Sequence, residues 1–83
     1  MHHTLLLPDR TVSLSPREFL LMRQLMTKAG EACTREELMK AVWGYDFDAD
    51  TNVIEVYISR LRNKLPPSLI ETVRHVGYTF VAP

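Results

Sequence analysis

Several features that define other protein classes are scarce or missing in this chain of 83 residues. Its one cysteine, Cys33, cannot form an intramolecular disulfide and has no cysteine neighbour at metal-ligand spacing, so we expect a small buried side chain and a reducing compartment. No apolar run approaches the roughly 18 residues of a membrane span, and no signal peptide is visible. We therefore expect a cytoplasmic protein with no metal site and no cofactor.

Catalytic signatures are missing as well. The cysteine, the three histidines and the serines show no nucleophile–base spacing, and no glycine-rich loop is present that would cradle a phosphate. The patterns H-x-x-x-H and C-x-x-C do not occur. The sequence therefore predicts no catalytic residues and no enzyme.

An excess of charge of either sign is also missing, because ten basic residues balance ten acidic ones. The distribution is uneven, however. Between residues 52 and 64 only Glu55 opposes Arg60, Arg62 and Lys64, whereas acidic residues gather in "GYDFDAD". A neutral chain can therefore carry one positive face, and the distribution of charge says more about partners than the total does.

The first half of the chain predicts a hairpin and two helices. In "TLLLPDRTVSL" two apolar runs flank Pro8-Asp9, as in a β-hairpin. In "SPREFLLMRQLMTKAG" Ser15 and Glu18 form a capping box, Pro16 suits the first helical position, and a glycine lies beyond the expected end. "TREELMKAVWG" repeats this pattern, with a second capping box, a closing Gly44 and an apolar face completed by either Met39 or Trp43.

The second half predicts a third helix and a second hairpin. The helix over 52–65 begins at a cap that is either Thr51 or Asn52, and Pro66-Pro67 ends it. Two β-rich runs, 70–74 and 78–81, are joined by a tight turn at 75–77. This order of elements is typical of a winged helix-turn-helix. We expect a single α+β domain, mainly α, over residues 1–83.

The third helix carries an unusual mixture of side chains. Val53, Val56 and Arg60 fall at i, i+3 and i+7 on one face. In a helix-turn-helix this helix enters the major groove, where valine methyls match thymine and arginine matches guanine. Four side chains flank this face and are placed to reach phosphates: Asn52, Tyr57, Arg62 and Lys64. The opposite stripe is apolar: Ile54, Ile58, Leu61 and Leu65.

Four ordered segments resemble the effector domains of the OmpR/PhoB family of two-component response regulators. "LSPREFLLM" is similar to that family's first helix, "TREELMKAVWGYDFDAD" to its second helix and loop, "VIEVYISRLRNKL" to its recognition helix and "IETVRHVGYTF" to its wing. The resemblance implies a bacterial domain that binds double-stranded promoter DNA, usually as a tandem dimer on direct repeats. It also implies a preceding receiver domain, absent from this chain, a cognate histidine kinase, and an N-terminal sheet that looks truncated here.

The resemblance also assigns roles to residues. It implies base contacts for Val53, Glu55, Val56 and Arg60, and backbone contacts for Trp43, Asn52, Tyr57, Ser59, Arg62, Thr72 and Tyr78. Arg74 corresponds to the side chain that enters the minor groove, and the loop with Tyr45, Asp46, Phe47 and Asp48 is a candidate RNA polymerase contact.

Alternatives stay open for several of these residues. Trp43 can pack beneath the acidic loop, Tyr78 can be partly core, and Glu55 can serve the dipole of its own helix. The chain as a whole can also be a winged-helix module that binds protein and not DNA, since a fold does not fix a function.

Overall fold

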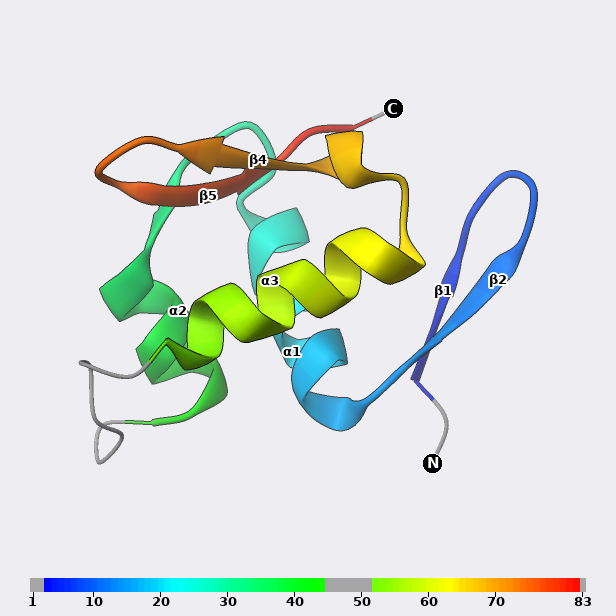
Figure 1. Cartoon of the computed structure of the whole chain (residues 1–83), viewed down its shortest axis with the longest axis horizontal. Helices are drawn as coiled ribbons and strands as arrows, with labels where there is room; N and C mark the ends of the chain where they lie inside the picture. Colours follow the sequence, from blue (N-terminus) through cyan, green and yellow to red (C-terminus); the bar gives the residue numbers. More distant parts are fainter. Residues whose placement is uncertain (1–2, 45–51, 83) are drawn as a thin grey trace.

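The computed structural model describes residues 3–44 and 52–82. Within these residues three α-helices surround one core, a two-stranded hairpin lies at one end, and a three-stranded sheet covers one side (Figure 1). The predicted order of elements is confirmed. Their bounds are β1 (His3–Leu6), β2 (Thr11–Leu14), α1 (Pro16–Thr27), β3 (Cys33–Thr34), α2 (Arg35–Val42), α3 (Val53–Lys64), a short 3-10 helix (Pro67–Leu69), β4 (Ile70–Val73) and β5 (Gly77–Phe80).

The N-terminal hairpin and α1 follow their sequence signals closely. β1 and β2 pair antiparallel, with Leu5 opposite Val12. The Ser15 hydroxyl accepts the Glu18 backbone N–H, and the Glu18 carboxylate accepts the Ser15 backbone N–H at 2.8 Å, which completes the predicted capping box. Because the backbone N–H groups of Ser15 and Glu18, which have no acceptor within the helix, are both hydrogen-bonded, the start of α1 is fixed.

Helix α2 departs from the prediction in two details. Thr34 caps it through its hydroxyl, but the Glu37 side chain does not reach back to close the box and instead pairs with Lys28 at 2.7 Å. Met39 is buried and Trp43 only half-buried, so methionine completes the apolar face. Gly44 closes the helix with a φ of +89°, a conformation that disfavours other residues.

Helix α3 begins without the predicted side-chain cap. Asn52 occupies the cap position, yet its side chain makes no capping hydrogen bond. Thr51, the other candidate, lies outside the described residues. The far end is as expected, because Leu65 is extended and Pro66 follows it.

The sheet contains a strand that the sequence did not predict. β3 has only two residues, too few for a periodic signal, and it pairs with β5 so that Thr34 lies opposite Gly77. Gly77 was predicted as a turn residue but is the first residue of β5, and the turn residues are 74–76. A Cβ at position 77 would lie 1.9 Å from the Cys33 carbonyl oxygen. Glycine is therefore needed there for strand approach and not for the turn.

The core joins all three helices and both hairpins. Cys33 is fully buried within it, as predicted, and burial raises the pKa of its thiol. None of the helices described within residues 3–44 and 52–82 is long and apolar enough to cross a membrane. The buried apolar residues are Val12, Leu14, Leu21, Met22, Leu25, Cys33, Leu38, Met39, Val42, Ile54, Ile58, Leu61, Leu65, Leu69, Ile70 and Phe80.

Candidate nucleic-acid interface

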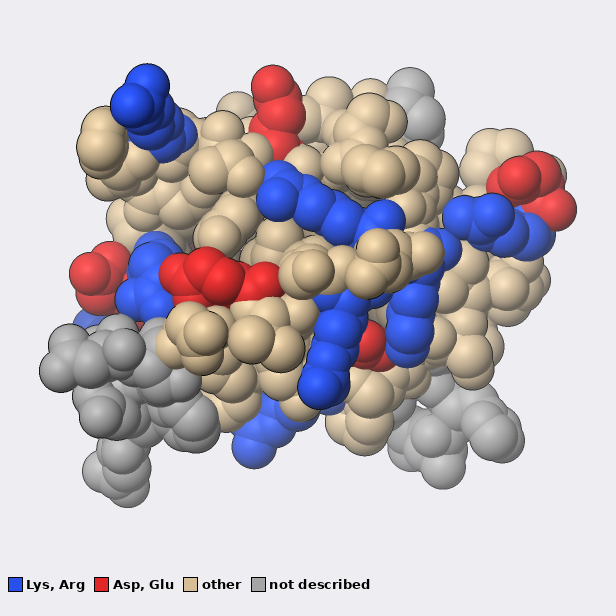
Figure 2. Space-filling model, in the orientation of Figure 1, with Lys and Arg blue, Asp and Glu red and all other residues tan. Residues whose placement is uncertain are grey.

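Helix α3 lies across the face of the molecule drawn in Figure 2, and Lys and Arg side chains gather along it. Its inner side is anchored by the buried stripe predicted from the sequence. On the outer side Ser59 and Arg60 are exposed and Val56 is 38% exposed. Val53 is different, because it is half-buried and packs against the core. The expected exposed face therefore consists of Val56 and Arg60, with Val53 at its margin.

Aromatic side chains connect α3 to α2 beside this face. The Arg60 guanidinium lies 5.0 Å from the centre of the Tyr57 ring, and the Tyr57 ring meets the Trp43 ring edge-on at 5.2 Å. Arg17 lies 5.7 Å from the Trp43 ring and donates a hydrogen bond to the Val42 carbonyl oxygen. Trp43 thus packs at the junction of the two helices. The acidic loop beneath which it was expected to pack lies outside the described residues, and its backbone contact stays a prediction.

Arg62 connects α3 to the wing. Its guanidinium donates to the Ile70 carbonyl oxygen and to the Thr72 hydroxyl, each at 2.9 Å, and lies 5.8 Å from the Tyr78 ring centre. Two predicted phosphate contacts, Arg62 and Thr72, are therefore bonded to each other. Tyr78 is half-buried against the core, as the partly-core interpretation predicted, and burial raises the pKa of its hydroxyl. This network fixes the orientation of β4 relative to α3.

Glu55 has a partner that the sequence did not reveal. Arg35, the first residue of α2, donates from Nε to one Glu55 oxygen at 2.6 Å and from Nη2 to the other at 3.1 Å. Hydrogen bonding to Arg35 holds the pKa of Glu55 below its ordinary value, so the carboxylate is ionised at neutral pH. The two residues lie 20 positions apart, a separation at which no local spacing rule applies.

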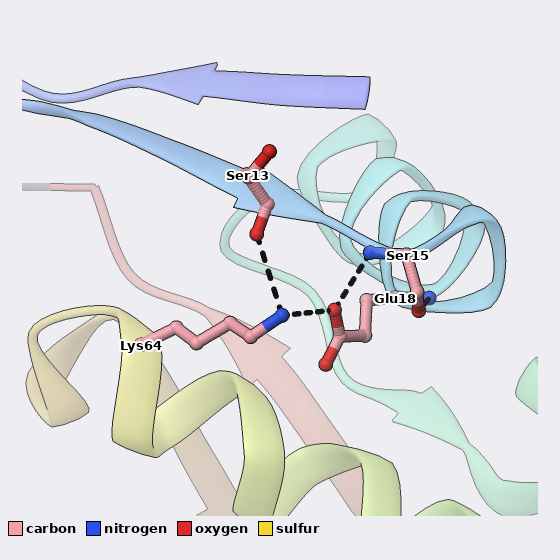
Figure 3. A network of polar contacts seen from close by, with 4 residues as sticks. All are labelled: Ser13, Ser15, Glu18 and Lys64. Atoms are coloured by element: carbon pink, nitrogen blue, oxygen red, sulfur yellow. Dashed lines mark hydrogen bonds and ion pairs between the residues drawn. The ribbon is translucent and has the colours of Figure 1, made fainter. Parts of the chain in front are cut away.

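Lys64 has two acceptors within the domain, and its predicted phosphate contact stays a prediction. Its ammonium donates to the Glu18 carboxylate at 2.6 Å and to the Ser13 carbonyl oxygen at 3.3 Å (Figure 3). Glu18 is only 2% exposed, and burial raises its pKa, but the hydrogen bonds from Lys64 and Ser15 outweigh burial and lower it. Arg10 also donates to the Lys64 carbonyl oxygen. Sequence reasoning assigned Glu18 only to the capping box.

The wing presents its turn at the same end of the molecule as the start of α3 (Figure 1). Arg74 is exposed in that turn, and His75 beside it adopts a φ of +65°. A hollow of about 340 Å³ lies between the turn and the start of α2, with Arg35, Thr72 and Tyr78 among its lining residues. Asn52 is exposed at the start of α3.

Tyr45, Asp46, Phe47 and Asp48, the candidate polymerase contacts, lie outside the described residues. Across the described parts of the chain, no three or more His, Cys, Asp or Glu side chains lie together in a way that could hold a metal ion.

Comparison with known proteins gives one consistent result. Residues 9–80 match the family described as "Transcriptional regulatory protein, C terminal". The chain is 43% identical over 74 residues to the transcriptional regulatory protein YkoG of Bacillus subtilis, covering 84% of this chain and 32% of YkoG. It is 40% identical over 76 residues to the response regulator protein PmrA of Pseudomonas aeruginosa, covering 92% of this chain and 34% of PmrA.

Solved structures agree with these sequence matches. The Klebsiella pneumoniae RstA DNA-binding domain, crystallised in complex with the RstA box, superposes with a TM-score of 0.85 at 36% identity, covering 94% of this chain and 82% of that one. The Escherichia coli CpxR DNA-binding domain gives a TM-score of 0.83 at 30% identity, covering 95% and 82%. The chain spans about a third of the length of the curated relatives that it matches.

Proposed function

Because this chain belongs to the family of C-terminal domains of transcriptional regulatory proteins, of the OmpR/PhoB response-regulator type, we propose that it binds promoter DNA in a sequence-specific manner. In this proposal α3 is the recognition helix and enters the major groove, and the hairpin of β4 and β5 is the wing and approaches the minor groove. The domain would serve as the DNA-binding output of a two-component regulator that controls transcription in the bacterial cytoplasm.

The outer face of α3 is the observation that carries this proposal. It presents a valine methyl surface, a hydroxyl and a guanidinium side by side at Val56, Ser59 and Arg60, and all three side chains are exposed. An isolated exposed valine is ordinary, but thymine methyls and guanine acceptors are the groups that this combination fits. The apolar inner side of the helix is fully buried, so the helix cannot turn to present another face.

The wing supports the same orientation of the DNA. Arg62 holds β4 against α3, and the turn that carries the exposed Arg74 lies at the same end of the domain as the start of the recognition helix (Figure 1). An arginine in such a position is suited to a narrow A·T-rich minor groove, where the negative potential is enhanced. Thr72, Tyr78 and Arg35 line the adjacent hollow, where their polar groups could contact a phosphate of the DNA backbone.

Further partners belong to the same proposal. Two relatives are named as response regulators, and on this basis the proposal includes a receiver domain and a cognate histidine kinase in the whole protein. It also includes the binding of two copies to direct repeats and a contact with RNA polymerase. The last of these would involve the acidic and aromatic segment of residues 45–48. Neutralising its acids should change transcriptional output while leaving operator affinity nearly unchanged.

Selection of binding sites from random duplex DNA at low salt tests the proposal. We expect a short motif to be enriched by the wild-type domain, and we expect Arg60→Ala to relax the preference at one position of it. Lys40→Ala, on the exposed side of α2, is a matched control that removes one cation from another helix. If no motif is enriched, the protein-binding alternative replaces this proposal.

A further inference from the structure

Arg35 occupies a position that its own helix does not favour. It is the first residue of α2, where the helix dipole is positive and acidic side chains are preferred. Glu36 and Glu37 follow it and are the acids of that first turn. A stabilising partner of Arg35 lies on another helix: it is the carboxylate of Glu55 on α3.

The pair spans the two helices of the helix-turn-helix. Both guanidinium bonds are formed, from Nε and from Nη2, one to each carboxylate oxygen, which is the fork geometry of arginine. Such a two-point bond fixes the plane of the carboxylate as well as its position. A single-point contact, as a lysine would make, fixes only the position.

Glu55 keeps acceptor capacity while it is paired. A carboxylate offers roughly four lone-pair directions. The two Arg35 donors and the backbone N–H of Glu55 itself take up part of this capacity, and the side chain is still 44% exposed. Glu55 adjoins Val56 in the first turn of α3, on the helix that we place in the major groove. An ionised carboxylate there is suited to accept the N4 amino group of cytosine.

We propose that Arg35 determines the base preference of α3 at one position, by holding the Glu55 carboxylate in the orientation that accepts a cytosine amino group. This inference rests on the proposed function, and it makes Arg35 a positioning residue and Glu55 the residue that contacts the base. Without the guanidinium, the carboxylate is free to take other rotamers and loses the cation that offsets its repulsion of phosphates.

A second ion pair in the molecule provides a matched control. Lys28 and Glu37 also join neighbouring helical segments, at 2.7 Å, with side chains 33% and 40% exposed. The corresponding values for Arg35 and Glu55 are 2.6 Å, 32% and 44%. The control pair has no member on α3. Its loss should therefore perturb the fold about as much as loss of Arg35–Glu55 but leave base preference unchanged.

The experiment first uses site selection with wild type and Glu55→Gln to find the base position at which Glu55 acts. Dissociation constants are then measured on two duplexes that differ only there, with C·G replaced by T·A. The proteins are wild type, Arg35→Met, Arg35→Lys, Glu55→Gln, the double variant Arg35→Met/Glu55→Gln, and Lys28→Met. Far-UV circular dichroism checks that each variant is folded.

We expect wild type to prefer the cytosine duplex by at least about fivefold, the range of a good base contact. Arg35→Met and Glu55→Gln should each reduce this ratio below about twofold. The double variant should show no further loss, since both changes remove the same contact of Glu55 with cytosine. Arg35→Lys should give an intermediate ratio. Lys28→Met should keep the wild-type ratio. If Arg35→Met does not fold, the intermediate ratio of Arg35→Lys decides.

Two results would overturn the inference while leaving the proposed function intact. In one, Arg35→Met (or Arg35→Lys, if the former is unfolded) keeps the full cytosine preference that Glu55→Gln loses. In the other, Glu55→Gln alters the preference at no position of a motif that wild type clearly selects. Failure of wild type to select any motif would instead overturn the proposed function, and this inference with it.

Discussion

The two ends of α3 each carry an ion pair with an N–O distance of 2.6 Å, and the two pairs differ in how exposed the carboxylate is. At the N-terminal end Glu55 is paired with Arg35, and both side chains are about a third or more exposed. At the C-terminal end Lys64 is paired with Glu18, whose side chain is 3% exposed. The contribution of each pair to stability depends on whether water reaches the carboxylate, so we expect the two pairs to have different roles.

The difference in exposure predicts which pair stabilises the fold and which pair can contact a ligand. An exposed pair is screened by water and salt, and contributes on the order of 0–1 kcal/mol to folding. A buried carboxylate without a cation costs several kcal/mol. We therefore expect the C-terminal pair to act on stability and the N-terminal pair to act on recognition.

The largest expected effect is on Lys64. Lys64→Met leaves Glu18 ionised and buried without its cation, and should lower the free energy of unfolding by about 3 kcal/mol. Arg35→Met, which breaks the exposed pair, should lower it by less than about 1 kcal/mol. Chemical denaturation monitored by circular dichroism measures both. Equal losses of unfolding free energy in the two variants would show that the two ion pairs contribute equally to stability, which would contradict the distinction drawn here.

A second change, Glu18→Gln, tests whether the stability lost in Lys64→Met comes from an unpaired buried charge. Glu18→Gln can still accept the Ser15 backbone N–H but carries no charge, so the double variant Glu18→Gln/Lys64→Met should recover part of the stability lost in Lys64→Met. If the double variant is less stable than Lys64→Met, the cost does not come from an unpaired buried charge.

The next effect concerns the outer face of α3. Arg60→Ala should weaken binding to the selected duplex by about 2 kcal/mol and relax the preference at one base position, because a guanidinium contact to a base edge is lost. Its unfolding free energy should change by less than about 0.5 kcal/mol, since Arg60 is exposed. Fluorescence anisotropy measures the affinity. Arg60→Lys should also lose affinity, because lysine lacks the planar fork. An unchanged motif for Arg60→Ala would contradict the assignment.

The stability that the Lys64–Glu18 pair contributes should depend on pH. The pKa of Glu18 is lowered from its ordinary value of 4.5, so its contribution to stability is fully present above about pH 4.5 and is lost as the pH falls through the folded-state pKa. In Lys64→Met burial is no longer offset by the cation, and the pKa should rise instead. The stability gap between wild type and Lys64→Met should therefore narrow between pH 6 and pH 4, to be measured by urea denaturation at several pH values. A constant gap would contradict the role assigned to Lys64.

The smallest expected effect is at the wing. Arg74→Ala should make the slope of log affinity against log salt shallower by about one unit, since roughly one counterion is no longer released. The loss should be largest on duplexes with A·T-rich flanks. Titrating one duplex at several salt concentrations measures the slope, with Glu37→Gln, on α2 and outside the wing, as a control. A slope equal to that of wild type would mean that the wing does not contact DNA.

Much of the fold was predictable because its signals are local. The capping box of Ser15, the closing Gly44 and the stop at Pro66 each depend on residues within one helical turn. The misses have equally physical causes. β3 is held by its pairing with β5 and not by its own two residues, and the glycine needed at position 77 is explained only by the Cys33 carbonyl beside it.

The position of the candidate site could be predicted from the sequence, but the contacts between its side chains could not. Periodicity correctly placed Val56 and Arg60 on the outside of α3. It did not predict that Lys64 turns inward to Glu18, that Arg62 holds the wing, or that Arg35 holds Glu55. These partners lie between 8 and 46 positions apart in the chain, where only the folded structure brings them together.

The most direct test is to titrate isotope-labelled domain with the selected duplex and follow its amide signals by NMR. We expect the largest changes along the outer face of α3, at Val56, Ser59 and Arg60, and at Arg74 in the wing. Signals of β1 and of the exposed side of α1, including Leu6 and Met26, should move little. Changes centred on β1 and α1, with α3 unaffected, would contradict the claim that the outward face of α3 reads DNA.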